Sequence, residues 1–145
     1  MRHFRHKSRL ALVLLFALLK FCAVTLHAQQ KPEQLAQASA GDWLTVSDAG
    51  KYGESWDQAA GLFKAAVTKD QWEQALHATR APLGNLVSRT LQSATFAKSL
   101  PGVPDGEYVV IKYDTRFEHK LSAVETVTPT LDKDGKWRVS GYYIQ

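Results

Sequence analysis

Cysteine is nearly absent from this sequence of 145 residues, which contains a single one, Cys22. The sequence therefore excludes a small scaffold held together by disulfides, because such a scaffold needs several paired cysteines. The rest of the composition is that of an ordinary globular chain, with 45% hydrophobic and 22% charged residues. These values exclude a disordered chain, and the length suits one compact domain of about 100–150 residues.

Acidic residues are absent from the first 28 positions, and this absence produces the positive charge of the whole chain. The sequence has 18 Lys and Arg against 14 Asp and Glu, but five of the 18 lie before Gln29. From Gln29 onward, the remaining 13 positive residues accompany all 14 negative ones. A nucleic-acid-binding domain carries a basic patch or stripe, so we expect no nucleic acid among the partners.

A long apolar run is also missing. The run Leu10–Leu19 is too short for a comfortable membrane span, which needs about 20 residues. It follows a positive segment, residues 1–9, and precedes a small residue, Ala28, which together form the pattern of a secretory signal peptide. We expect residues 1–28 to be removed, so that the mature chain begins at Gln29 and is periplasmic or secreted, with no membrane contact after cleavage.

One feature of the cleavage site favours an alternative. Leu26 is large where a small residue is preferred, and an uncleaved segment would anchor the protein in the inner membrane. A lipid anchor is not expected, because the residue before Cys22 is the bulky Phe21. The mature chain, residues 29–145, is predicted to form a single α+β domain without cysteine.

Apolar residues recur at helical spacing in three consecutive segments. The first helix is predicted over Glu33–Ala49, and Gly50 ends it. A second helix is predicted to start at Tyr52 and to continue to Phe63. The third helix begins with the capping-box pattern Thr68–Gln71 and ends at Pro82, which cannot continue a helix.

Beyond Gly84 the hydrophobic period changes to two, which is typical of strands. Helices followed by consecutive antiparallel strands indicate an α+β class, with the N-terminal helices packed on a curved antiparallel sheet of about four strands. Such a curled sheet closed by helices forms a cone. The four strands are predicted at Asn85–Ser99, Tyr108–Phe117, Leu121–Leu131 and Trp137–Ile144, with Asp132–Gly135 as a tight turn before the last.

This order of elements is similar to the nuclear-transport-factor-2-like, or cystatin-like, cone folds. Five further segments carry sequence motifs: Trp43–Trp56, Arg80–Gly84, Leu100–Tyr108, Glu125–Thr128 and Asp134–Tyr143. With these motifs in this order, the chain resembles the bacterial domain-of-unknown-function family 4019 over Gln37–Gln145. The resemblance implies an exported, single-domain bacterial protein and carries over no catalytic residue.

The sequence contains few signs of catalytic chemistry. It has no Gly-rich phosphate loop before a helix and no G-x-S-x-G nucleophile motif. Metal binding needs clustered ligands, whereas His77 and His119 are isolated, so we expect no metal and no cofactor. Trp43, Trp56 and Trp72 lie on apolar helical stripes and are predicted to pack in the core.

A small polar set remains as a weak binding-pocket candidate: Arg80, Glu125, Arg138 and Tyr142. Arg138 and Tyr142 are predicted to share one face of the last strand, where Arg138 could pair with Glu125 across adjacent strands. The residues favour a structural salt bridge on the exposed sheet face over a small polar pocket, and a catalytic acid or base is the remaining alternative. Arg80 is also explained by the dipole at a helix C-terminus.

We therefore expect a binding or accessory protein without catalytic machinery, whose partner is a small ligand or an envelope protein. A homodimer through the sheet is a further expectation, with Tyr108, Tyr142 and Tyr143 in its interface. The first alternative is a small enzyme that uses Glu125 as a general base inside the cone. The second is a purely structural envelope or stress protein with no pocket.

Overall fold

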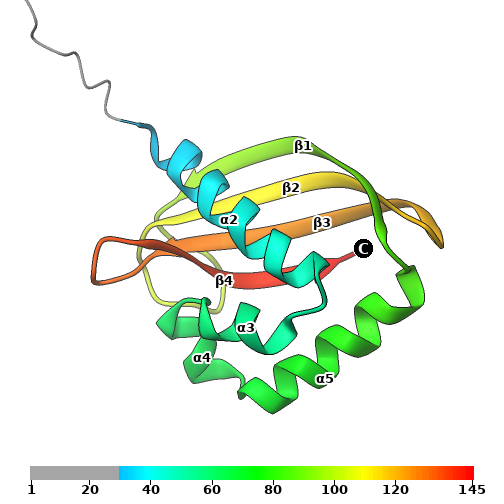
Figure 1. Cartoon of the computed structure of the whole chain (residues 1–145). Coiled ribbons are helices and arrows are strands. Elements are labelled where there is room, and N and C mark those ends of the chain that lie inside the picture. The colour runs from blue at the N-terminus through cyan, green and yellow to red at the C-terminus, as the bar shows by residue number, and fades with distance from the viewer. Residues whose placement is uncertain (1–29) are drawn as a thin grey trace, which may run out of the picture.

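The fold combines a four-stranded antiparallel sheet, in the order β1-β2-β3-β4, with helices that all precede it in the chain (Figure 1). The structure, a computed structural model, describes residues 30–145; the predicted signal peptide and its cleavage site lie outside the described residues. The predicted α+β class is confirmed. The strands are β1 (Leu86–Ala97), β2 (Tyr108–Phe117), β3 (Lys120–Leu131) and β4 (Trp137–Ile144).

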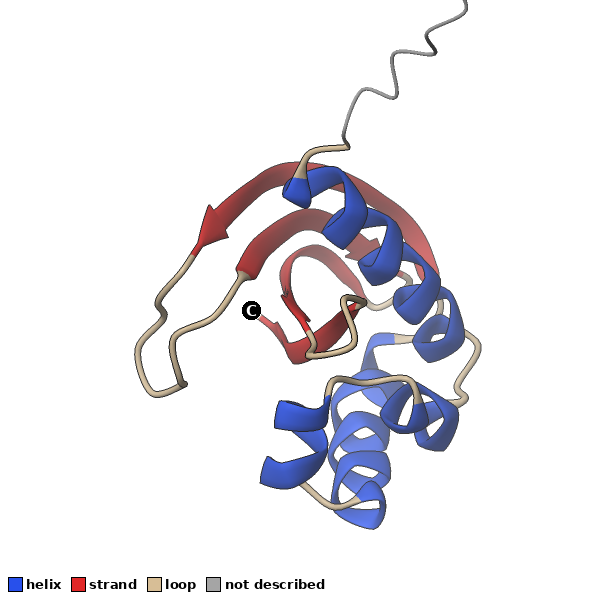
Figure 2. Ribbon diagram, turned by 90° about the vertical axis from the view of Figure 1, so that its left-hand side faces the viewer, coloured by secondary structure: helices blue, strands red, loops and turns tan. Residues whose placement is uncertain are grey.

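The sheet is strongly curved. Figure 2 shows its strands as nested arcs crossed by the long helix α2 (Pro32–Asp48), with the other helices grouped at one end. Each pair of neighbouring strands contains a register irregularity, and such bulges increase the bend and twist of a sheet. We call the side that faces the helices the covered face and the opposite side the outer face. Among residues 30–145, no helix is both long and apolar enough to cross a membrane.

Helix α2 lies across the sheet and contacts all four strands. Its buried side includes two alanines, Ala36 and Ala40, which have no exposed surface and let the helix approach the sheet closely. Trp43 continues this side and is 2% exposed. The chain leaves the helix through Gly50, whose φ of 73° lies in the left-handed region that favours glycine.

The predicted helix over Tyr52–Phe63 is wrong in one respect, because the structure divides this segment into α3 (Tyr52–Asp57) and α4 (Gly61–Ala66). The break is stabilised by the sheet. The backbone N–H of Ala60 donates to the carbonyl of Val139 in β4 at 2.8 Å. Ala60 is fully buried there, so a tertiary hydrogen bond replaces the helical one that the sequence spacing suggested.

Helix α5 (Lys69–Arg80) begins as predicted, with both halves of the capping box formed. The N–H of Gln71 donates to the Thr68 hydroxyl at 3.3 Å, and the N–H of Thr68 donates to the Gln71 side chain at 3.0 Å. A 3-10 turn, Ala81–Leu83, contains Pro82 and leads into the sheet.

The core joins α2, α5 and the covered face of the sheet. Trp43 and Trp72 lie with their ring centres 6.0 Å apart, and both are buried as the apolar stripes predicted. Their indole N–H groups donate to the carbonyl and hydroxyl oxygens of Ser55 at 2.8 Å and 2.9 Å. Trp56, predicted in the core as well, is partly buried against it. Because each of these indole nitrogens has an acceptor, the aromatic core buries no unpaired indole donor.

The predicted alternation of the last strand is wrong beyond Val139. Thr128 pairs with Gly141 and Pro129 with Val139, so β4 has one extra residue at this point. The bulge reverses the alternation that follows. Tyr142 therefore turns to the covered face and packs against the core, whereas Tyr143 is 51% exposed on the outer face.

Candidate functional site

A cluster of charged and hydroxyl-bearing side chains lies on the covered face of the sheet, near the C-terminal ends of α2 and α5. The side chain of Glu125 is fully buried, and that of Arg80 is 4% exposed. All four strands and both helices contribute to it. This charged cluster consists of Asp48, Arg80, Arg89, Thr115, Glu125 and Tyr142.

Glu125 is the centre of the cluster, and both of its carboxylate oxygens are fully engaged. Oε2 accepts from Arg89 Nε at 2.6 Å and from the Thr115 hydroxyl at 2.6 Å. Oε1 accepts from the Tyr142 hydroxyl at 2.5 Å and from Arg89 Nη2 at 3.1 Å. Arg80 Nη1 lies 3.8 Å from Oε1 and adds a second positive charge.

Asp48 joins the two arginines on the helix side. Its Oδ1 accepts from Arg80 Nη2 at 2.7 Å and from Arg89 Nη2 at 3.0 Å, while Oδ2 accepts from Arg89 Nη1 at 2.8 Å. Two guanidinium groups therefore meet two carboxylates, and the formal charge of the cluster is zero. A buried ionic group is stable only with such complete pairing, because an unpaired charge in the interior is costly.

The pKa values of the cluster reflect this pairing. Burial alone would raise the pKa of Asp48, but the hydrogen bonds from Arg89 and Arg80 outweigh it and hold the pKa below its ordinary value. Burial, together with the neighbouring Glu125 carboxylate, raises the pKa of Tyr142 well above its usual range. Both shifts favour the ionisation states that the hydrogen bonds require.

Local structure explains how the two arginines reach the centre. Arg80 occupies the last turn of α5, where a cation interacts favourably with the helix dipole, and its guanidinium lies 4.9 Å from the ring centre of Phe117. Arg89 lies between two register irregularities of β1 and pairs with Thr115 of β2. Its side chain therefore lies on the same face of the sheet as that of Thr115, which is the covered face. Tyr142 is directed inward by the bulge in β4.

Three of the four predicted site residues are brought together: Arg80, Glu125 and Tyr142. The predicted pair of Arg138 with Glu125 is wrong. Arg138 precedes the β4 bulge and faces away from Glu125, forming ion pairs with Asp132 at 2.9 Å and Asp134 at 2.7 Å. The hydrogen bond from Arg138 lowers the pKa of Asp134 to about 2. Arg138 thus stabilises the turn between β3 and β4.

The structure also places the three tyrosines of the predicted dimer interface in different environments. Tyr108 is 3% exposed and donates its hydroxyl hydrogen to the Pro104 carbonyl at 2.6 Å. Tyr142 faces the charged cluster. Of the three predicted interface tyrosines, only Tyr143 offers its ring at the outer face.

Sequence reasoning missed three members of the cluster, Asp48, Arg89 and Thr115. Two of them carried a usable signal. Asp48 lies at the C-terminus of α2, where the helix dipole disfavours a carboxylate, so it needed a compensating cation. Arg89 is the one charged residue of β1. Thr115 is an ordinary strand residue, and nothing in the sequence distinguishes it.

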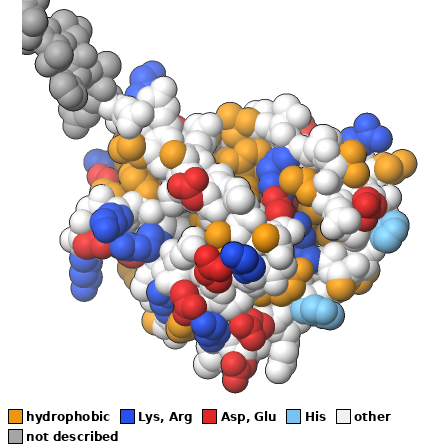
Figure 3. Space-filling view, in the orientation of Figure 1, with side chains coloured by type: hydrophobic (Ala, Val, Ile, Leu, Met, Phe, Trp, Pro, Cys, Tyr) orange, Lys and Arg blue, Asp and Glu red, His pale blue; other side chains and the backbone are white. Residues whose placement is uncertain are grey.

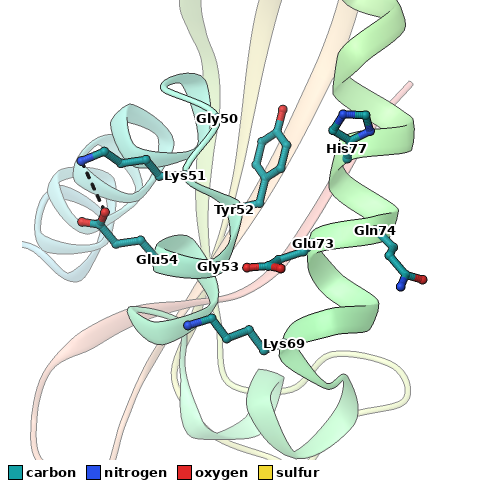
Figure 4. A pocket seen from close by; sticks show the side chains of 9 residues that line it. All are labelled: Gly50, Lys51, Tyr52, Gly53, Glu54, Lys69, Glu73, Gln74 and His77. Atoms are coloured by element: carbon teal, nitrogen blue, oxygen red, sulfur yellow. Dashed lines mark ion pairs between the residues drawn. The ribbon is translucent and has the colours of Figure 1, made fainter.

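A second feature lies outside the cluster, at the surface between α3 and α5. Here an open groove of about 730 Å³ separates the two helices (Figure 4). The space-filling view shows acidic and basic side chains interspersed over this part of the molecule (Figure 3). The groove is lined by Gly50, Lys51, Tyr52, Gly53, Glu54, Lys69, Glu73, Gln74 and His77. Within residues 30–145, no group of three or more His, Cys, Asp or Glu side chains is arranged to hold a metal ion.

A family model described as Protein of unknown function (DUF4019) matches residues 39–142. The chain belongs to this family. The DUF4019 segment contains every residue of the charged cluster and the whole lining of the α3–α5 groove, so both features lie within the family's domain. The predicted family resemblance is confirmed. A comparison with curated proteins found no match.

Tyr142 offers a direct test of the cluster in this DUF4019 domain. Tyr142→Phe keeps the ring but removes the hydroxyl that donates to Glu125, so we expect the free energy of unfolding to fall by about 1–3 kcal/mol. The pKa of Tyr142 in the folded protein lies above the ordinary tyrosine pKa of about 10. The protonated hydroxyl therefore contributes fully to stability below about pH 10, and this contribution is lost as the pH rises further. The free energy of unfolding of the variant should therefore fall less steeply above that pH than that of the parent protein.

The measurement is urea unfolding at a series of pH values, followed by fluorescence. Tyr143→Phe is the matched control, because Tyr143 is the next residue of β4 and is exposed. It should change the free energy of unfolding by less than about 0.5 kcal/mol. Equal effects of the two variants would contradict the assigned role of Tyr142.

Proposed function

We propose that this DUF4019 protein is an exported binding or accessory protein whose charged cluster stabilises the fold and performs no reaction. The observation that carries the proposal is the saturation of Glu125. Each of its oxygens accepts two hydrogen bonds, and its side chain has no exposed surface.

A general base needs a free lone pair within hydrogen-bond reach of the proton that it removes. Glu125 could provide one only by giving up a bond to Arg89, Thr115 or Tyr142, which would leave a buried partner unsatisfied. Structural ion-pair networks also perturb pKa values, so the shifts of Asp48 and Tyr142 are consistent with a structural role. These points favour the binding proposal over the enzyme that uses Glu125 as its base.

The export part of the proposal rests on the sequence pattern of residues 1–28. The mature chain carries almost balanced charge, with 13 positive and 14 negative residues after residue 28, so its partner is a small ligand or an envelope protein, and nucleic acid is not among its partners. Binding then uses the surface, because the interior at Glu125 is closed.

Native mass spectrometry of the protein recovered from the periplasm of an expressing cell tests this proposal. We expect a mass that corresponds to residues 29–145, with either a retained small molecule or a second copy of the chain. Recovery from membranes with residues 1–28 intact would contradict export. A ligand-free monomer in the periplasmic fraction would contradict stable binding of either kind.

A further inference from the structure

The groove between α3 and α5 has walls of distinct chemistry. Lys69, Glu73 and His77 follow one another at four-residue spacing, so they lie one above another along α5. Tyr52 and Gly53 of α3 form the opposite side, and the rings of Tyr52 and His77 meet edge to face at 6.5 Å (Figure 4). The centre of the groove is therefore bordered by an aromatic pair and a carboxylate.

Among residues 30–145, the carboxylate of Glu73 forms no ion pair within 4 Å. The ammonium of Lys69 pairs with Asp57 at 2.6 Å instead. Lys51, at the outer edge, pairs with Glu54 at 3.4 Å. Of the two carboxylates in the groove lining, Glu54 has an ion pair and Glu73 has none with the described residues, although the Lys69 ammonium is near enough to act on Glu73 electrostatically.

Gly53 creates the space that Glu73 occupies. A Cβ atom at this position would lie 2.0 Å from Oε1 of Glu73 and 2.8 Å from Cε of Lys69. Only glycine therefore lets the end of the Glu73 side chain lie directly over the backbone of α3. Any larger residue would displace this flexible side chain without disturbing the core.

We propose that this groove binds a primary ammonium group, of a free alkylamine or of a lysine side chain. The proposal deepens the binding role stated above by naming a ligand class. An ammonium has three N–H donors and a positive charge. Glu73 accepts one hydrogen bond, a neutral His77 ring nitrogen accepts another, and the ring of Tyr52 attracts the charge through its π-system.

Other ligand classes fit the groove less well. A carboxylate or phosphate would be repelled by the Glu73 carboxylate, which has no ion pair of its own within the described part of the chain. A quaternary ammonium has no N–H to donate to Glu73 and His77. A divalent metal needs more ligands than the described residues bring together here.

The test follows backbone amide signals of the mature protein, residues 29–145, by two-dimensional NMR during titration at low salt. The first probes are n-butylammonium chloride and sodium butyrate, which each have four carbon atoms and differ in the sign of their charge. We expect the amine to shift the signals of Gly53, Glu73 and His77 with a Kd of about 1–10 mM, and butyrate to leave them in place. Equal shifts with both probes, or none with the amine, would overturn the proposal.

Blocked tripeptides distinguish the two sources of the ammonium. The peptide acetyl-Gly-Lys-Gly-amide is compared with its Nε-acetylated form, which lacks the charge. Tighter binding of the lysine peptide than of butylammonium assigns the groove to a protein partner, and tighter binding of butylammonium assigns it to free amines. Binding of the acetylated peptide as strong as that of the charged one would overturn the ammonium assignment.

Two variants test the groove itself. Glu73→Gln keeps the shape and removes the charge, and we expect at least about a tenfold weaker amine affinity, equivalent to about 1.4 kcal/mol. Gly53→Ala should displace Glu73 and weaken binding to a similar degree while the fold is retained, because alanine is the better helix former. Asp70→Asn, on the same helix outside the groove lining, is the matched control and should preserve affinity within about twofold.

Unchanged affinity in both Glu73→Gln and Gly53→Ala would overturn the assignment to this groove. The test uses purified protein in solution, so its outcome does not depend on export. Failure of amine binding would refute this inference and leave the periplasmic measurement to decide the broader proposal.

Discussion

Replacing Glu125 with Gln should lower the free energy of unfolding by about 3–5 kcal/mol, because the change leaves two buried arginines against a single carboxylate. Gln also replaces one of the two accepting oxygens with an N–H₂ group, so either Thr115 or Tyr142, together with one N–H of Arg89, loses its acceptor. The measurement is chemical denaturation at pH 7, followed by tryptophan fluorescence.

Asp114→Asn is the matched control for this experiment. Asp114 lies on the exposed side of β2, and within residues 30–145 its one side-chain hydrogen bond is accepted from Gln92 Nε2 at 3.3 Å. Its neutralisation should change the free energy of unfolding by less than about 0.5 kcal/mol. If Glu125→Gln instead left stability unchanged or increased it, the charged cluster would resemble a destabilising active site, and the enzyme alternative would be favoured.

A double-mutant cycle sharpens the same prediction. Arg89→Met should destabilise the protein to a similar degree, since it leaves Glu125 and Asp48 with one arginine between them. Removing both members of the pair, with Arg89→Met and Glu125→Gln together, should cost less than the sum of the single changes, by about 1–3 kcal/mol. Simple additivity would show that the two side chains do not act as a unit.

The second large effect is expected at the centre of the aromatic core. Trp43→Ala should lower the free energy of unfolding by about 3–5 kcal/mol. The side chain is 2% exposed, its ring lies 5.2 Å from that of Tyr142, and its N–H donates to the Ser55 carbonyl. The substitution would therefore open a cavity and also leave that carbonyl without its donor.

Leu35→Ala on the same helix is the control, because Leu35 is 40% exposed and should cost less than about 1 kcal/mol. Thermal unfolding followed by circular dichroism measures both variants without relying on the fluorescence of the altered tryptophan. A loss below about 1 kcal/mol for Trp43→Ala would contradict the role of Trp43 as the packing centre of α2.

Local signals in the sequence were sufficient for most elements of the fold. The capping box at Thr68 and the period-two pattern of Tyr108–Phe117 depend on residues close in the chain, and both were predicted correctly. The break between α3 and α4 was not, because Ala60 bonds to a strand almost eighty positions later. Propensity and spacing contain no information on such a bond.

The candidate site was likewise predicted only in part from the sequence. The sequence pointed to Glu125 because it interrupts an apolar and β-branched strand, to Arg80 because it ends a helix, and to Tyr142 because of its place in the last strand. It paired Glu125 with the wrong arginine, because the strand register places Arg138 opposite Thr130, five positions along β3 from Glu125. Arg89 of β1 lies opposite Thr115 of β2 and reaches Glu125 instead.

The sequence by itself determined the family, the α+β class, the order of the elements and the identity of the aromatic core, because these depend on motifs, hydrophobic period and turn residues within short segments. Only the tertiary structure decided that the buried charges neutralise one another, that Glu125 has no free lone pair, and that Gly53 makes room for Glu73 beside Tyr52 and His77. Each of these results joins segments that are distant in the chain, and their contacts arise from strand register and helix packing.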